Sequence, residues 1–212
     1  MKSIVHRSLA ILTIGCLASS TALAVSLSVD PAGIAGFTGS QNFASGTLSA
    51  RMDYAVYAPG AYALSANAGV DPSLGTKYVY AYQIFNTGTV TPVSVSTIGQ
   101  SPSSAGTSAA LAENDLINLL SAGGAAASST PILSASVKYN FEAPELAVGA
   151  FSKVLLYTSP FAPKFANGTV SDGGFTDQHP VPSPTPEPAT AMTLGLMSLV
   201  LGSRLHRSNK HI

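Results

Sequence analysis

Apolar and polar residues alternate along several short stretches in the middle of the chain. From Leu48 to Ala58 every second residue is apolar or aromatic, until Pro59-Gly60 interrupts the pattern. Tyr78 to Phe85 is a mostly apolar run between segments that contain glycine and asparagine. Because the side chains of a β-strand point alternately to opposite faces, these patterns predict two strands. Shorter patterns of the same kind fall at 93–97, 137–141 and 148–157.

Short strands separated by glycine, proline and asparagine predict an all-β protein, an antiparallel β-sandwich ectodomain formed by residues 25–177. We expect a hairpin turn at Asn167-Gly168, a dipeptide that favours tight turns. One segment differs, because residues 109–120 place aliphatic side chains at helical spacing, with Glu113 and Asp115 near its start. This segment predicts one short helical insertion between strands.

The first 24 residues have the parts of a secretory signal peptide. Lys2 and Arg7 form a positive start, an apolar run follows, and Ala22-Leu23-Ala24 provides a cleavage site of small residues. We therefore expect a signal helix that signal peptidase removes, which leaves Val25 as the first exported residue. Cys16, the only cysteine, lies inside this segment. The alternative for Cys16 is lipid attachment, whereas its removal with the signal leaves no thiol.

The C-terminal part of the chain consists of three segments in order. Residues 178–188 hold five prolines and predict an extended linker that joins neither a sheet nor a helix. Residues 189–203 carry no charge and predict a transmembrane helix. Residues 204–212 form a basic tail, which we expect to stay on the cytoplasmic side of the membrane. Its basic residues are Arg204, Arg207 and Lys210.

The predicted transmembrane helix is short. The residues from Ala189 to Gly202 extend about 21 Å as a helix, against roughly 30 Å for the hydrocarbon core of a bilayer. Such short runs are more often core helices, but this one follows a proline-rich segment and has no charged face. We expect Arg204 and Arg207 to reach toward the lipid head groups and the bilayer to thin.

The order of Pro186-Glu187-Pro188, an apolar helix and a basic cluster resembles the PEP-CTERM sorting signal of Gram-negative bacteria. The resemblance implies an exosortase-like enzyme of the inner membrane as a partner, which processes the chain near this motif. It also implies transit through that membrane to the cell surface or to an extracellular matrix such as a biofilm. The segments Met52–Asn86 and Phe141–Gly174 look like the ectodomain of some of these proteins, a likeness that implies no activity.

The charge distribution argues against two broad classes of protein. Only 9% of the residues are charged, and Val25–Pro188 holds ten acidic residues against five basic ones. A nucleic-acid-binding protein needs a basic face to meet phosphates, so nucleic acid is not expected as a partner. A disordered acidic chain is also disfavoured, because 46% of the residues are hydrophobic.

The chain offers little material for a catalytic site. His179 is the only histidine between the predicted processing sites, and it adjoins the prolines, a poor position for a general base. Glu142 and Glu145 are the nearest pair of acids for a glycosidase, but Pro144 between them indicates a loop with solvated side chains. We therefore predict no enzyme, no catalytic residue and no cofactor, with a polysaccharide hydrolase as the least favoured alternative.

Two further groups of residues are candidates for ligand binding. Asp172-Gly173-Gly174 and Asp177 offer the oxygen ligands that calcium prefers, but they lack the spacing of a calcium loop. A glycine-rich turn is therefore favoured there, and no metal is predicted. Tyr78, Tyr80 and Tyr82 would share one face of a strand, where exposed rings could stack on an exopolysaccharide. The favoured alternative is that these rings fill the core.

Together these patterns predict an exported, non-enzymatic protein of the cell surface or extracellular matrix, sorted through its C-terminal signal. The alternative is a glycan-binding module of the biofilm matrix with the same destination. In both cases the ectodomain acts outside the cytoplasm.

Overall fold

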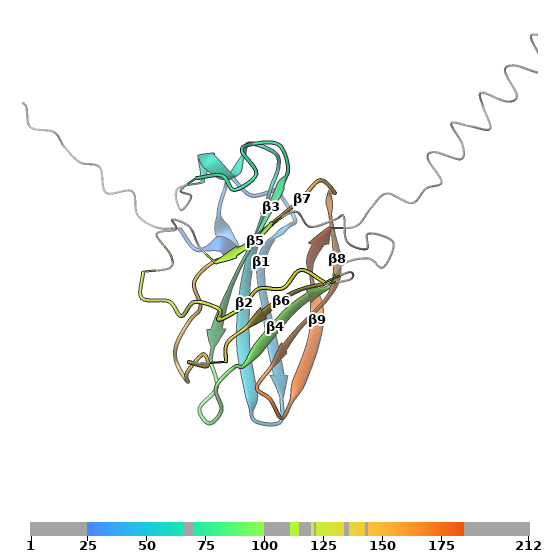
Figure 1. Ribbon diagram of the computed structural model, residues 1–212. Coiled ribbons are helices and arrows are strands. Elements are labelled where there is room, and N and C mark those ends of the chain that lie inside the picture. Colours follow the sequence, from blue (N-terminus) through green and yellow to red (C-terminus); the bar gives the residue numbers. More distant parts are fainter. Residues whose placement is uncertain are drawn as a thin grey trace, which may run out of the picture.

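A computed structural model describes most of the chain between the two predicted processing sites (Figure 1). The described residues are 25–65, 70–99, 111–114, 120, 122–133, 136–142 and 144–184. The signal with Ala22 and Ala24, the motif Pro186-Glu187-Pro188, the membrane helix and the basic tail lie outside them and stay predictions. No helix within the described part of the chain is long and apolar enough to cross a membrane.

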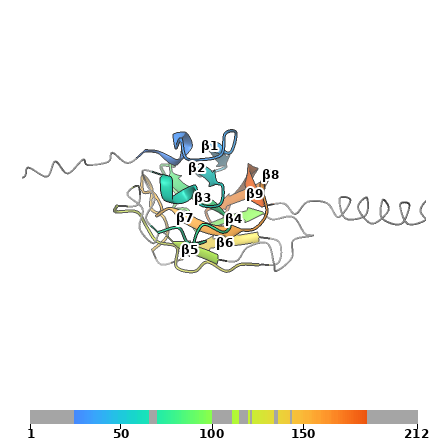
Figure 2. The same cartoon turned by 90° about the horizontal axis from the view of Figure 1, so that it is seen from above.

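The described fold consists of two antiparallel sheets and two short 3-10 helices (Figure 1, Figure 2). In strand order, the first sheet contains β1 (Thr38–Ser45), β2 (Leu48–Tyr57), β3 (Tyr78–Asn86), β7 (Leu155–Ser159) and β5 (Leu111–Asn114). The second sheet contains β6 (Ser136–Asn140), β4 (Val95–Gly99), β8 (Pro163–Ser171) and β9 (Thr176–Pro184). The helices are η1 (Leu27–Val29) and η2 (Tyr62–Leu64). The prediction of an all-β fold with antiparallel strands is confirmed.

The two sheets pack face to face and share one apolar core. Met52, Tyr54 and Val56 of β2 belong to a buried cluster that also contains Tyr139 of β6 and Val181 of β9. The spacing of two along β2 is the alternation that the sequence predicts for this strand. Burial of apolar surface, at about 25 cal/mol per Å², is the main force that holds the sheets together.

The opposite face of the first sheet is also apolar at one end, and the N-terminal segment covers it. Leu27 of η1 and Tyr62 of η2 pack with Tyr57 in a second buried cluster. Asp30, just after η1, is buried and accepts hydrogen bonds from the Tyr57 hydroxyl (Oη–Oδ2 3.0 Å) and from Ser65 Oγ. These contacts hold the residues that follow the predicted signal cleavage site against the sheet.

The predicted helical insertion at 109–120 is wrong at residues 111–114. Leu111–Asn114 is strand β5, which pairs with β7 from Leu111↔Thr158 to Asn114↔Leu155. The other side of β7 pairs with β3, so β5 supplies partners for backbone groups that would otherwise lack them in the sheet. Helix propensity differs by at most about 0.7 kcal/mol between ordinary residues, and this pairing overrides it.

The predicted linker at 178–188 is wrong as far as Pro184, because residues 176–184 form β9, the edge strand of the second sheet. Pro180, Pro182 and Pro184 alternate along β9, so their nitrogens all face the side away from β8. The residues between them keep their N–H groups for hydrogen bonds to β8. Proline is excluded from central strands but is compatible with an edge. The ectodomain therefore extends beyond its predicted end at residue 177.

Pro182 occupies a position where its missing N–H matters. The residue is buried, and its carbonyl oxygen accepts a hydrogen bond from Tyr82 Oη at 2.5 Å, so this side of β9 faces the protein interior. We expect Pro182→Ala to lower the free energy of unfolding by about 1–3 kcal/mol, because it introduces a buried N–H without a partner. Pro180→Ala, at an exposed position of the same strand, should cost less than about 1 kcal/mol. Equal losses for the two variants in urea denaturation would contradict this explanation.

The predicted hairpin turn at Asn167-Gly168 is also wrong. Strand β8 runs through both residues, and the turn into β9 lies at 172–175. Gly168 is required by close packing instead, because a Cβ there would lie 2.6 Å from Cγ2 of Val181. The glycine-rich turn favoured for Asp172-Gly173-Gly174 is this hairpin, with Gly173 in the left-handed region at φ +86°.

Candidate functional site

The predicted row of tyrosines does not form an exposed sugar-binding face. Tyr80 and Tyr82 are 0% exposed and lie in the core between the sheets, and Tyr78 is partly exposed. A ring without solvent exposure cannot stack on a sugar, so the glycan-contact interpretation is wrong for Tyr80 and Tyr82. The alternative holds, because the spacing of two turns them to the inner face while Val79 and Ala81 belong to the outer cluster.

Tyr80 and Tyr82 instead stack with Tyr157 of β7. The ring centroids of Tyr80 and Tyr157 are 4.8 Å apart with an interplanar angle of 2°, and those of Tyr82 and Tyr157 are 6.0 Å apart. The hydroxyls of Tyr80 and Tyr82 donate to the backbone carbonyls of Phe161 and Pro182. Burial raises the pKa of all three phenols, because it disfavours the charged phenolate.

The carboxylates considered for calcium support the fold at the β8–β9 turn. Asp172 Oδ1 accepts hydrogen bonds from the amides of Gly174 (3.0 Å) and Phe175 (2.7 Å), and Asp177 Oδ2 accepts one from the Ala44 amide (2.7 Å). Burial acts to raise the pKa of Asp172, but the hydrogen bonds outweigh it and hold that pKa below its usual value. Within the described residues, no three side chains of His, Cys, Asp or Glu gather closely enough to hold a metal ion.

The residues considered as catalytic groups have ordinary surroundings. His179 lies on β9, with Nε2 3.0 Å from Asp177 Oδ2, and its ring makes a T-shaped contact with the Phe43 ring, with 5.3 Å between centroids. Glu142 and Glu145 are both exposed. The contacts of His179 help to join β9 to β1, whereas the two acids are solvated.

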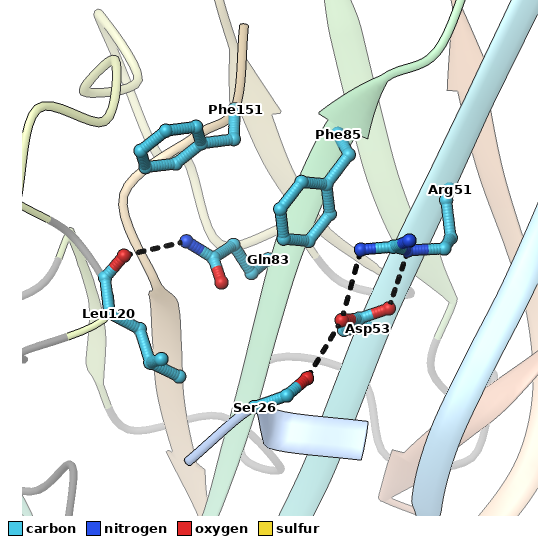
Figure 3. Close-up of a pocket in the computed structure, with 7 residues that line it drawn as sticks. All are labelled: Ser26, Arg51, Asp53, Gln83, Phe85, Leu120 and Phe151. Atoms are coloured by element: carbon cyan, nitrogen blue, oxygen red, sulfur yellow. Dashed lines mark hydrogen bonds and ion pairs between the residues drawn. The ribbon is translucent and has the colours of Figure 1, made fainter. Parts of the chain in front are cut away.

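A pocket of about 270 Å³ lies on the outer face of the first sheet, next to the end that η1 and η2 cover (Figure 3). The register of β2 and β3 places Arg51 opposite Phe85 and Asp53 opposite Gln83. Their side chains alternate with those of the core and therefore point away from it. We call this the outer-face pocket. Its lining residues are Ser26, Arg51, Asp53, Gln83, Phe85, Leu120 and Phe151.

Asp53 is the buried anchor of the outer-face pocket. It is 3% exposed, and its Oδ1 and Oδ2 accept hydrogen bonds from Ser40 Oγ (2.8 Å) and Ser26 Oγ (3.1 Å). The Arg51 guanidinium forms an ion pair with the same carboxylate, with an Nε–Oδ1 distance of 2.9 Å. Because both oxygens are engaged, Asp53 holds Arg51 in place rather than presenting a free negative charge.

Arg51 is held from a second side by an aromatic ring. Its Cζ lies 4.3 Å from the centroid of the Phe85 ring, which makes a cation–π contact. The Phe85 ring lies 6.0 Å, between centroids, from the ring of Phe151. The Arg51 side chain is still 42% exposed, so part of the guanidinium faces solvent.

Gln83 contributes a hydrogen-bond acceptor to the outer-face pocket. The residue is 3% exposed, and its Nε2 donates to the carbonyl oxygens of Leu120 and Ser152, both at 3.1 Å. These two acceptors identify the nitrogen end of the amide and turn Oε1 away from the Leu120 carbonyl (Figure 3). No described residue donates a hydrogen bond to Oε1.

Sequence reasoning missed this pocket, although one signal was visible. Gln83 is the only amide side chain inside the apolar run from Tyr78 to Phe85. A polar side chain in such a run indicates a hydrogen bond that compensates for its burial. The pairing of Arg51 with Asp53 was harder to see, because it depends on which face of β2 is outward. Phe151 and Leu120 come from distant segments whose position only the fold determines.

Comparison with known proteins does not assign this site, since no protein-family model, no curated protein and no solved structure matches the chain.

Proposed function

We propose that this protein is an exported, non-enzymatic component of the cell surface or extracellular matrix of a Gram-negative bacterium. Its C-terminal segment is a PEP-CTERM-like sorting signal that an exosortase-like enzyme processes. The observation that carries the proposal is the order of Pro186-Glu187-Pro188, the uncharged stretch 189–203 and the basic tail 204–212. The partners are signal peptidase, the processing enzyme and, during transit, the inner membrane.

The extent of the described fold is compatible with processing at both ends. The packed N-terminal segment begins directly after the predicted cleavage site, with Leu27 already buried. Strand β9, the last described strand, ends at Pro184, two residues before Pro186. Both predicted processing sites therefore fall outside the described strands, and processing at either one leaves those strands intact.

The tyrosine row does not support the glycan-binding alternative, because Tyr80 and Tyr82 are buried. A hydrolase has no support in the position of Glu142 and Glu145, which are solvated side chains. We therefore assign these residues no role in binding or turnover.

Replacement of Glu187 tests the sorting proposal. In cells that contain an exosortase-like enzyme, we expect Glu187→Ala to abolish processing, because the enzyme reads the motif that contains this carboxylate. Intact-mass measurement should show a precursor that keeps the C-terminal segment and stays in the membrane fraction. Glu145→Ala, a change of an exposed acid elsewhere, should be processed normally. A Glu187→Ala product of unchanged mature mass that still leaves the membrane would contradict the proposal.

A further inference from the structure

The outer-face pocket has a fixed hydrogen-bond acceptor that the described fold leaves without a donor. Gln83 is 97% buried as a residue, since its exposed fraction is 3%, and two backbone carbonyls fix its amide. Gln83 Oε1 is not among the fully buried side-chain atoms that lack a partner, so it is open to the pocket, where a solvent or ligand group can donate a hydrogen bond to it (Figure 3).

Arg51, on the neighbouring strand β2, supplies hydrogen-bond donors to the same pocket. A guanidinium has five N–H groups, and the Nε and Nη2 atoms of Arg51 are the ones directed at Asp53. The remaining N–H groups belong to a side chain that is 42% exposed. Arg51 is also held by the ring of Phe85, so these donors are presented in a fixed plane. The pocket thus offers both a fixed acceptor and fixed donors.

The charges of the pocket favour a neutral ligand. Arg51 and Asp53 neutralise each other, and the Asp53 carboxylate is engaged by Ser26 and Ser40, so a cation finds no free anion. An anion would meet the acceptor Oε1 of Gln83 and would gain no net positive charge from the Arg51–Asp53 pair. The excess of acidic residues across Val25–Pro188 also repels polyanions.

The walls of the pocket add apolar surface. Phe85 and Phe151 present aromatic rings, and Leu120 closes the side next to Gln83 (Figure 3). A pyranose has hydroxyl groups on its edge, which both donate and accept hydrogen bonds, and C–H groups on its faces, which pack on aromatic rings. The volume of about 270 Å³ is below the range of about 300–1,000 Å³ for drug-sized ligands, so one sugar ring is the matching size.

We propose that the outer-face pocket binds a single neutral pyranose residue, at the end of or within a neutral polysaccharide. A hydroxyl of the sugar donates to Gln83 Oε1, a second accepts from Arg51, and a C–H face packs on Phe151. Ser26 and Asp53 act as positioning residues that keep Arg51 in its plane. This binding is independent of the C-terminal signal, so it stands or falls separately from the sorting proposal.

The test uses the full chain, purified in a detergent whose head group is not a sugar. Methyl glycosides of neutral hexoses and the corresponding uronic acids are titrated, with binding followed by saturation-transfer NMR and calorimetry. We expect at least one neutral glycoside to bind with a roughly millimolar Kd, as is usual for a small polar ligand. The matching uronic acid should bind at least about fivefold more weakly, because it carries a charge.

Two variants locate the binding. Arg51→Lys keeps the positive charge beside Asp53 but loses the planar donors, and should weaken binding about tenfold. Phe151→Leu keeps the wall apolar but removes the ring, and should weaken binding about fivefold. Phe175→Leu is the matched control, because this ring is 44% exposed and lies in the β8–β9 turn outside the pocket. Melting temperatures of all variants confirm that each one is folded.

Three results would overturn the proposal. The first is a folded wild-type chain that binds none of the neutral glycosides. The second is tighter binding of the uronic acids, which would show that the pocket prefers an anion. The third is a folded Arg51→Lys or Phe151→Leu variant with unchanged affinity, or a Phe175→Leu control that loses as much, because the sugar would then bind elsewhere.

Discussion

Raising the pH above about 10 is expected to unfold this protein cooperatively. Five tyrosines are 0% exposed, and burial raises the pKa of each one, because the low-polarity interior disfavours a phenolate. They are Tyr57, Tyr80, Tyr82, Tyr139 and Tyr157. In the unfolded chain the same side chains ionise near pH 10. The unfolded state therefore releases protons at a pH where the folded state keeps them.

The sign and size of the effect follow from this difference in bound protons. Below pH 10 both states keep the phenol protons, and the stabilisation of the folded state is complete. Above pH 10 each buried tyrosine lowers the free energy of unfolding by about 1.4 kcal/mol per pH unit. Five such groups give about 7 kcal/mol per unit, against a total stability of about 5–15 kcal/mol for a typical domain. We expect the midpoint of unfolding at about pH 11–12.

A pH titration that records circular dichroism and phenolate absorbance together measures this effect. The two signals should change together for the buried tyrosines, because ionisation requires unfolding. Tyr139→Phe provides an internal check, since Tyr139 Oη is buried without a hydrogen-bond partner among the described residues. This variant should lower the slope by about a fifth and move the midpoint to higher pH. Phenolate absorbance that is complete while the fold is intact would contradict the expectation.

The strands that the sequence predicts best are those with a complete local pattern. Strands β2 and β3 combine alternation or an apolar run with turn residues at their ends, and both lie where they are expected. Strands β5 and β9 are determined by distant partners instead. The local pattern of β5 is helical and the prolines of β9 argue against a sheet, yet pairing with β7 and β8 decides both. The sequence pattern of β5 or β9 alone does not indicate which distant strand will pair with it.

The same limit applies to the candidate site. Tyr80 and Tyr82 attract attention as an aromatic row, but a spacing of two does not tell which face of a strand is buried. The outer residues of β2 and β3 combine Arg51, Asp53 and Gln83, whose meaning depends on the strand register. An ion pair is readable from the sequence only after that register is known, whereas the amide inside an apolar run was readable beforehand.

The position of the pocket has a structural reason. The first sheet has apolar side chains on both faces, and η1 and η2 cover only part of its outer face. Ser26, next to η1, is hydrogen-bonded to Asp53, so the covering segment also forms one wall of the outer-face pocket. Arg51 and Asp53 lie on β2, and Gln83 and Phe85 lie on β3, so these four side chains stand on strands, which hold side chains more accurately than loops do.

Replacing Tyr157 by alanine should be the most damaging single change in the core. Its ring lies between the sheets, fully buried, and stacks on both Tyr80 and Tyr82. Removing a buried aromatic ring loses its contacts and leaves a cavity, which costs about 3–5 kcal/mol. A loss of about 4 kcal/mol corresponds to a fall in melting temperature of roughly 8–16 °C for a domain of this size.

Tyr157→Phe separates the ring from the hydroxyl. The hydroxyl lies 3.4 Å from Tyr82 Oη, a long contact, and Tyr82 has its own acceptor in the Pro182 carbonyl. We therefore expect Tyr157→Phe to cost less than about 1 kcal/mol in urea denaturation, far less than Tyr157→Ala. Comparable losses for the two variants would show that the hydroxyl, and not the stacked ring, holds the sheets together. A folded Tyr157→Ala chain of nearly normal stability would contradict core packing as the role of the tyrosines.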